Sequence, residues 1–140
     1  LIQCLIILTL GFIFGIRLAT GVGGFFTLLL VSVLLGFGVT IISLILAFVL
    51  NNHGDYFAVL GITVLPLTFL STAFVPLDSM AAWMRVLAWV NPLTYTVDGM
   101  RMLILSGWDV SSLLRMILVL VCFDAVMFWI GAKVLSRRLA

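Results

Sequence analysis

Long apolar runs separated by short polar turns make up most of this chain. The pattern predicts four apolar, membrane-spanning helices, over residues 1–16, 23–50, 57–75 and 112–132. No side chain between Arg17 and Asp55 is ionisable. About 20 apolar residues suffice to cross a hydrocarbon core about 30 Å thick, so this stretch has the length of a complete span. The sequence therefore predicts an all-α, polytopic transmembrane bundle.

The connections between these runs differ sharply in length. Residues 17–22 and 51–56 are short and rich in turn-forming side chains, so the spans on either side of each should be antiparallel neighbours. Residues 76–111 are too many for a tight turn and too apolar for an ordinary solvated loop. We expect this region to lie in, or dip into, the membrane interface.

Composition indicates the solvent. Of the 140 residues, 65% are hydrophobic and 9% are charged, and the mean hydropathy is +1.42, well beyond the values of soluble domains. The net charge of +2 is scattered and forms no basic stripe, which argues against a nucleic-acid partner. Cys4 and Cys122 lie in apolar runs and are interpreted as small buried apolar residues, because no Cys/His cluster suggests a metal site.

The ends of the chain carry two further expectations. The sequence opens inside an apolar run with no basic segment before it, so we interpret it as part of a larger membrane domain. Lys133, Arg137 and Arg138 follow the last predicted span, which favours a cytoplasmic C-terminus. With four spans both ends lie inside, and the remaining arginines then face outward against the rule.

Two prolines mark the third predicted span. Pro66 lacks a backbone N–H and predicts a kink around residues 62–66, with Thr63 or Thr68 able to bond the freed backbone groups. The kink is either a hinge or a static bend that improves packing. Pro76 disfavours helical geometry in the preceding residue and should end the span.

An amphipathic segment follows Pro76. Asp78 and Ser79 are placed to cap a short helix in which Trp83 and other apolar side chains recur at helical spacing. Trp83 and Trp89 suit the headgroup level of a membrane, where an indole ring is buried and its N–H stays wet. The segment is therefore predicted to form a helix at the membrane interface.

A break and a second short helix come next. Asn91 and Pro92 should end the first helix, and residues 94–105 should form the second. Asp98 and Arg101 are three residues apart and can pair, which favours a structural role over contact with substrate or an outer gate.

Small residues recur at a spacing that would let helices approach closely. They are Gly11, Gly15, Ser32, Gly36 and Thr40. They suit packing within the bundle or against a second copy, and the alternative is that they face lipid without a partner.

Asp124 falls near the middle of the last predicted span. An ionised carboxylate there costs at least about 2.5 kcal/mol on insertion scales unless it is buried or partnered. It is an intramembrane functional candidate, and the alternative is a protonated or hydrogen-bonded carboxyl group that packs against another span.

Three consecutive stretches carry a resemblance to a known family. They are FLSTAFVPLD at 69–78, the tryptophan-containing segment at 83–90 and NPLTYTVDGMR at 91–101. In this order and spacing they resemble the signature region of type-2 ABC-transporter permeases, the membrane subunits of export pumps for drugs, lipid-linked glycans and similar amphiphiles.

The resemblance implies a permease half of six spans, of which this chain would hold the last four, with a pair of re-entrant helices before the final span. It implies a second permease half, identical or different, and a separate nucleotide-binding ATPase that uses ATP and Mg²⁺. The sequence contains no GxxxxGK[ST] loop, so the chain itself is expected to be neither an enzyme nor a cofactor-binding protein. Two alternatives remain at this point: a gradient-driven transporter or channel, and a membrane scaffold that transports nothing.

Overall fold

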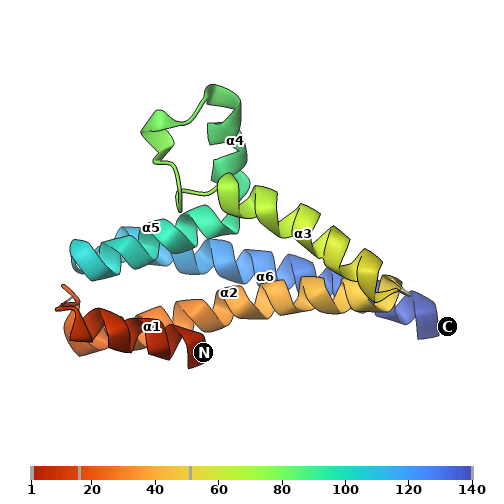
Figure 1. The fold of residues 1–140 in the computed structure, drawn as a ribbon, viewed down its shortest axis with the longest axis horizontal. Helices are drawn as coiled ribbons and strands as arrows, with labels where there is room; N and C mark the ends of the chain where they lie inside the picture. Colours follow the sequence, from red (N-terminus) through yellow and green to blue (C-terminus); the bar gives the residue numbers. More distant parts are fainter. Residues whose placement is uncertain (1, 16, 51, 140) are drawn as a thin grey trace.

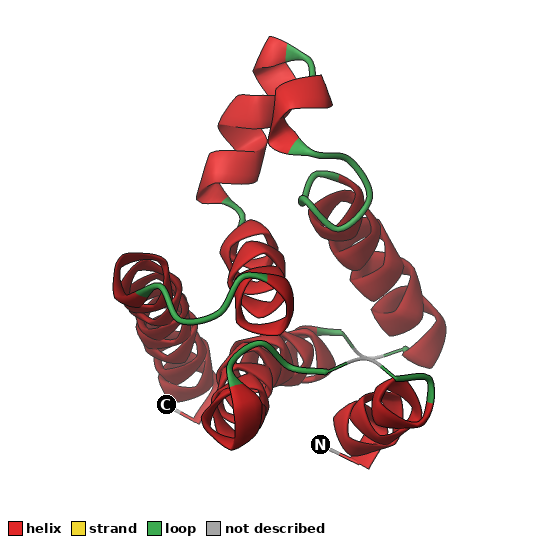
Figure 2. Ribbon diagram, turned by 90° about the vertical axis from the view of Figure 1, so that its left-hand side faces the viewer, coloured by secondary structure: helices red, strands yellow, loops and turns green. Residues whose placement is uncertain are grey.

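The computed structural model describes residues 2–15, 17–50 and 52–139, and these contain helices and turns but no strand (Figures 1 and 2). The six α-helices in this part of the chain are α1 (Ile2–Ile13), α2 (Gly21–Val49), α3 (His53–Phe69), α4 (Ala82–Val90), α5 (Pro92–Leu105) and α6 (Val110–Leu139). A single 3-10 turn, η1 (Leu77–Ser79), precedes α4. The predicted all-α fold is confirmed. Leu1 and Ile16, the predicted bounds of the first span, lie outside the described residues, as do the side chains of Arg137 and Arg138.

Two long apolar helices form the axis of the molecule. α2 has 29 residues and α6 has 30, so each is about 45 Å long, enough to cross a membrane with some tilt. They run side by side in the same direction, because Gly23 lies against Trp108 at one end and Gly131 lies against Ile41 and Ile45 toward the other. α1 and α3 are shorter, at 12 and 17 residues.

A third helix, α5, completes the core, but only along the half of the bundle where α2 and α6 begin. α5 packs between α2 and α6, and the buried cluster where the three helices meet consists of Leu28, Val31, Leu103, Met116 and Leu120. A Cβ atom on Gly99 would overlap the Met116 sulfur, so glycine is what lets α5 lie this close to α6. Lipid is as apolar as these side chains, so close packing and not escape from water stabilises the contact.

α5 runs antiparallel to α2 and covers about half its length. Its last carbonyls are satisfied by the turn before α2: Thr20 Oγ1 donates to the Leu103 carbonyl at 2.7 Å, and the Ala19 N–H donates to the Ile104 carbonyl at 3.0 Å. Fourteen residues of α5 then reach about 21 Å back along the bundle. Asn91 therefore lies near the middle of α2, where α3 arrives from the opposite end and α4 stands away from the bundle (Figure 1).

The third predicted span differs most from the structure. Its helix begins at His53 rather than residue 57 and ends at Phe69, six residues before the predicted end at 75. The cause lies after Pro66: the Ser71 N–H bonds the Thr68 carbonyl, and the Ser71 hydroxyl donates to that same carbonyl at 2.7 Å. A serine that bonds the nearby backbone in this way competes with the helical pattern and turns the chain.

The outer faces of the bundle are strongly apolar. Large exposed side chains occur on both long helices, among them Phe26, Phe37, Leu118 and Phe128. Cys4 and Cys122 are both free thiols. Cys122 is exposed and Cys4 is half-buried, so the prediction that both are buried is wrong. Such faces match a lipid surrounding, in which apolar side chains need no protein cover.

Candidate functional site

The junction of α3 and α5 is an interruption of regular backbone in the middle of an apolar bundle. Asn91, only 4% exposed, closes it from both sides. Its Nδ2 donates to the Leu67 carbonyl at 2.6 Å, and its Oδ1 accepts from the Leu93 N–H at 3.0 Å. The Leu67 carbonyl is one of the last four of α3 and has no partner within that helix. One side chain thus caps the end of α3 and the start of α5. The predicted break at Asn91 and Pro92 is confirmed, with Pro92 in the first turn of α5.

The turn after α3 is held by a second set of polar contacts. Ser71 and Thr72 are buried, and Thr72 Oγ1 donates to the Thr94 carbonyl at 3.3 Å. Arg101 Nη2 donates to the Thr72 carbonyl at 3.2 Å. The pair predicted between Asp98 and Arg101 forms, although at 3.9 Å and half exposed it is a weak one. Arg101 therefore acts mainly by fixing irregular backbone.

The segment leading to α4 corrects one prediction. Asp78 does not cap α4: the chain is extended at Met80 and Ala81, the helix starts at Ala82, and its N-cap residue Ala81 has no side-chain cap. Asp78 lies in η1, four residues before the first helical residue and too early to reach the free N–H groups. Arg85 stabilises this turn instead, donating from Nε to the Leu77 carbonyl and from Nη2 to the Met80 carbonyl.

α4 has an apolar face that nothing in the described chain covers. On this face Trp83 is 63% exposed and Val86 is 57% exposed, whereas Ala88 is fully buried. Trp89, on the flank of the helix, is 59% exposed. The helix is tied to α5 through Tyr95, whose hydroxyl donates to the Trp89 carbonyl at 2.8 Å. The predicted amphipathic helix is present, and its position at a headgroup level remains a prediction.

Pro66 and Pro76 lie in different kinds of backbone. Pro66 lies inside α3, three residues before its end, and Thr63 and Thr68 donate to the Val59 and Val64 carbonyls of their own helix. The carbonyl that Pro66 frees is that of Ile62, so these hydroxyls do not serve it. Pro76 is extended and precedes η1, seven residues beyond the end of α3.

Asp124 lies where α6 crosses α2. It is 8% exposed, its Oδ1 lies against Gly38, and that oxygen has no hydrogen-bond partner among the described residues. No ionisable side chain lies anywhere in α2. The residue that makes room for the carboxyl group is Gly38, which the spacing of small residues did not identify.

The small residues that the sequence singled out do not form the contact between α2 and α6. Gly36 is exposed, and nothing lies within 4 Å of the position that a Cβ atom on it would take. Ser32 and Thr40 bond the Leu28 and Gly36 carbonyls of their own helix. Gly15 follows the end of α1 with φ +84°, so it shares no helical face with Gly11. Packing of the Ser32, Gly36 and Thr40 face on a second copy stays a prediction.

The start of α6 has a cap that sequence reasoning missed. Asp109 Oδ2 accepts from the Ser112 hydroxyl at 2.6 Å, and Oδ1 accepts from the hydroxyl and the N–H of Ser111. These hydrogen bonds, first of all that from Ser112, hold the pKa of Asp109 below its usual 3.8. Asp-Val-Ser-Ser before an apolar run is a recognisable helix start and was the available signal.

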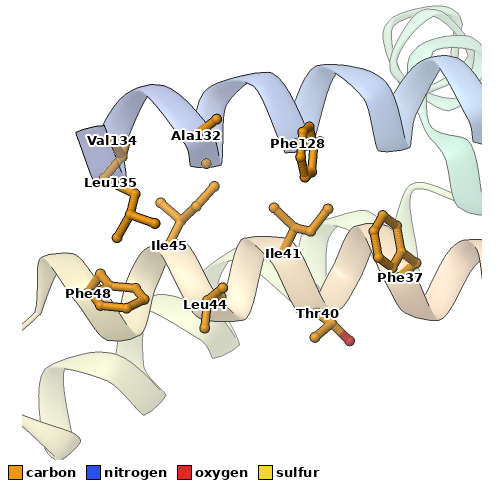
Figure 3. A pocket seen from close by; sticks show the side chains of 11 residues that line it. Phe37, Thr40, Ile41, Leu44, Ile45, Phe48, Phe128, Ala132, Val134 and Leu135 are labelled. Carbon is orange, nitrogen blue, oxygen red and sulfur yellow. The ribbon is translucent and has the colours of Figure 1, made fainter. Parts of the chain in front are cut away.

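An apolar groove of about 390 Å³ lies between α2 and α6, near the C-terminal ends of both helices (Figure 3). Phe37, Ile41 and Phe48 line it from α2, and Phe128 and Leu135 line it from α6. The groove offers surface for apolar chains and no group for chemistry. Among the described residues, no set of three His, Cys, Asp or Glu side chains lies close enough to hold a metal ion.

Comparison with known proteins adds to this geometry. Residues 1–105 match the family described as "ABC-2 type transporter". The chain is 35% identical over 150 residues to "Putative transport permease ycf38" of Cyanophora paradoxa, an alignment that covers 96% of this chain and 50% of that protein. Proteins of the same name from Porphyra purpurea and Pyropia yezoensis are 33% and 31% identical, each over 79% of this chain and 42% of the relative. The chain thus spans about half the length of these relatives, and no solved structure matches it.

Proposed function

The chain belongs to the ABC-2 type transporter family, and from this premise we propose that it forms, with a second permease half, the membrane pathway of an ATP-driven exporter. The proposed cargo is an amphiphilic or lipid-linked molecule. The energy comes from a separate nucleotide-binding ATPase that holds ATP and Mg²⁺, since the sequence has no phosphate-binding loop of its own.

One observation carries the proposal: polar side chains stabilise irregular backbone at the middle of an apolar bundle. Asn91 bonds the end of α3, and Arg101 bonds the Thr72 carbonyl in the turn that follows. Non-helical backbone at membrane depth is tolerated only where it is buried in protein or lines a water-filled path. A static bundle would have no need of such an interruption, whereas a pathway that opens needs a place where helices can move.

In the proposed cycle, closure of the ATPase on the inner side shifts α2, α3 and α6, and the region from Pro76 to Arg101 forms the outer closure. The junction between Pro66 and Asn91 is the hinge, because Pro66 removes a helical hydrogen bond three residues before α3 ends. Trp83, Trp89 and Asp98 belong to the part that moves.

The proposed location is the cell membrane, with several passes and a cytoplasmic C-terminus. α2 and α6 each span it, and α1 and α3 are the shorter members of the four-span set. Lys133, over the Trp129 ring at 4.8 Å near the end of α6, marks the inner side under the positive-inside rule.

An affinity purification tests the central claim. The complete tagged permease is isolated from native membranes in mild detergent, and mass spectrometry looks for an ATPase with a phosphate-binding loop in stoichiometric amount. Recovery of one supports the exporter and allows cargo to be screened by stimulated ATP hydrolysis. Its reproducible absence from an intact complex would overturn the proposal.

Asp124 favours one alternative, a gradient-driven carrier or channel. A buried carboxyl group with an unpartnered oxygen in a long apolar helix is the kind of group that binds and releases a proton in such proteins. Collapse of the proton gradient by an ionophore separates the two functions: flux that continues while ATP is held constant supports the ATP-driven exporter, and flux that stops supports the carrier.

A further inference from the structure

A mixed polar and apolar cavity of about 290 Å³ lies between α4, α5 and α6, beside the α3–α5 junction. Its walls carry both charged and apolar side chains, chiefly Trp89, Thr94, Asp98, Met102, Ser112 and Arg115. It lies in the half of the bundle where α6 begins, since Arg115 is five residues into that helix, about 8 Å from its start.

Two opposite charges line this cavity without pairing with each other. Arg115 is exposed near the start of α6 and makes no ion pair or hydrogen bond with the described part of the chain. Asp98 forms only a weak pair with Arg101, at 3.9 Å, and its side chain is 43% exposed. A molecule that bears both an anion and a cation would satisfy both groups.

The hydroxyl groups of the cavity wall are not free hydrogen-bond donors. Thr94 is 2% exposed, and its Oγ1 lies buried in the wall without a hydrogen-bond partner among the described residues, out of reach of a ligand in the cavity. The Ser112 hydroxyl already donates its hydrogen bond to Asp109 and can only accept from the cavity side.

The size and the surroundings narrow the class of ligand. At about 290 Å³ the cavity is at the lower limit for small-molecule sites, so it suits a headgroup rather than a whole lipid. Leu114 and Leu118, exposed on α6 next to Arg115, give acyl chains an apolar surface outside it. Trp89 adds an aromatic wall of the kind that attracts an ammonium group.

We propose that this cavity binds the headgroup of a zwitterionic phospholipid with a primary amine, the phosphate on Arg115 and the ammonium on Asp98. A primary ammonium donates hydrogen bonds to a carboxylate and a quaternary one does not, so phosphatidylethanolamine binds in preference to phosphatidylcholine. Phosphatidylglycerol lacks the cation, so it leaves the Asp98 carboxylate with only its weak pair to Arg101. The inference needs α5 and α6 to lie in a membrane but does not require export, so it can fail independently of the proposed function.

Native mass spectrometry of the complete permease with its partner subunits tests it. The complex is stripped of lipid and placed in phosphatidylcholine nanodiscs that contain either phosphatidylethanolamine or phosphatidylglycerol, and the retained lipid is counted. We expect phosphatidylethanolamine to be retained preferentially. Arg115→Gln and Asp98→Asn should each lower that retention about tenfold, since each removes a charged hydrogen bond. Arg17→Gln, at an exposed arginine outside the cavity, is the matched control and should change nothing.

Two further variants guard against misfolding. Arg115→Lys keeps the charge and should restore most of the retention. Thr94→Val removes the buried hydroxyl in the cavity wall without changing the volume, so retention should stay unchanged while the melting temperature holds or rises. A loss of retention in Thr94→Val as large as in the two charge variants would contradict the assignment of the headgroup to Arg115 and Asp98.

Competition with soluble phosphoethanolamine shows whether the cavity binds the headgroup of a membrane lipid or a soluble molecule with the same chemical group. We expect it not to displace the lipid at equal concentration, because it has no acyl chains for the surface beside Arg115. Displacement at equal concentration would assign the cavity to a soluble ligand and overturn the lipid. Equal retention of phosphatidylglycerol, or retention unchanged in both charge variants, would overturn the site itself.

Discussion

The side-chain amide of Asn91 joins two helices by donating to the Leu67 carbonyl of α3 at 2.6 Å while its oxygen accepts from the first turn of α5. Neither helix reaches through the bundle alone, and this one buried residue is where they meet. A membrane interior supplies no water to satisfy broken backbone, so the side chain must do so.

Asn91→Ala removes both hydrogen bonds. We expect a loss of about 2–4 kcal/mol in the free energy of unfolding, from a missing cap and a buried carbonyl left unsatisfied, seen as a lower melting temperature of the purified permease. Asn52→Ala is the matched control, because Asn52 caps only the start of α3, through the Gly54 N–H at 3.0 Å, and is exposed. Equal losses in the two variants would show that the bond to α3 adds nothing.

Gly38→Ala should separate α2 from α6. An added Cβ would overlap Asp124 Oδ1 and the ring of Phe123, whereas Gly36→Ala, on a face away from the contact, meets nothing within 4 Å. We expect Gly38→Ala to lower the melting temperature and Gly36→Ala to hold or raise it, as alanine favours a helix by about 1 kcal/mol over glycine. If Gly36→Ala instead weakened assembly of two permease halves in a cross-linking assay, the predicted small-residue face would be the dimer contact.

The choice between Gly36 and Gly38 shows where sequence reasoning stops. The spacing of Ser32, Gly36 and Thr40 indicates a face narrow enough for close approach, but only the partner decides which face is used. The partner here is Asp124, on a helix far along the chain from Gly38. The same limit applies to Arg85 and Thr20, whose acceptors are carbonyls on other elements.

Local signals are more reliable. Absence of charge predicts α2 almost to its bounds, Asn91 and Pro92 predict the break between α4 and α5, and the spacing of Asp98 and Arg101 predicts their pair. The predicted end of α3 is wrong because a serine beyond the proline bonds the backbone first. The predicted cap of α4 is wrong because the chain stays extended for two residues after η1.

Acidification should weaken the start of α6. Hydrogen bonds from Ser112 and Ser111 hold the pKa of Asp109 below 3.8 in the folded protein. A carboxyl group with a lowered folded-state pKa contributes stability that is fully present above 3.8 and is lost as the pH falls through that lowered pKa. The difference in melting temperature between the native protein and Asp109→Asn should therefore shrink in acid, since asparagine caps the helix without titrating. A difference that stayed constant would rule out the carboxylate as the source.

Arg101 and Asp98 should contribute unequally to stability. Arg101→Gln removes the bond to the Thr72 carbonyl and is expected to speed hydrogen exchange in the peptide covering residues 70–80. Asp98→Asn removes only a half-exposed pair at 3.9 Å, worth less than about 1 kcal/mol, and should leave exchange there unchanged. Faster exchange in both variants would mean that the pair, and not the carbonyl contact, holds the turn.

The depth of α4 in the membrane is the measurement that tests its predicted position at a headgroup. α5 is about 21 Å long and ends beside the start of α2, so α4 leaves the bundle near its middle, whereas Trp108 lies against Gly23 at the start of α2. In variants that keep one tryptophan, we expect Trp83 to be quenched most by lipids brominated near the ends of their acyl chains and Trp108 by lipids that carry a quencher at the headgroup. The order follows because the helix bundle, and not the amphipathic character of α4, fixes how far Trp83 lies from the surface. If the two tryptophans reported the same shallow depth, α4 would lie along the headgroups, and the α3–α5 junction would have to lie at the membrane surface rather than inside it.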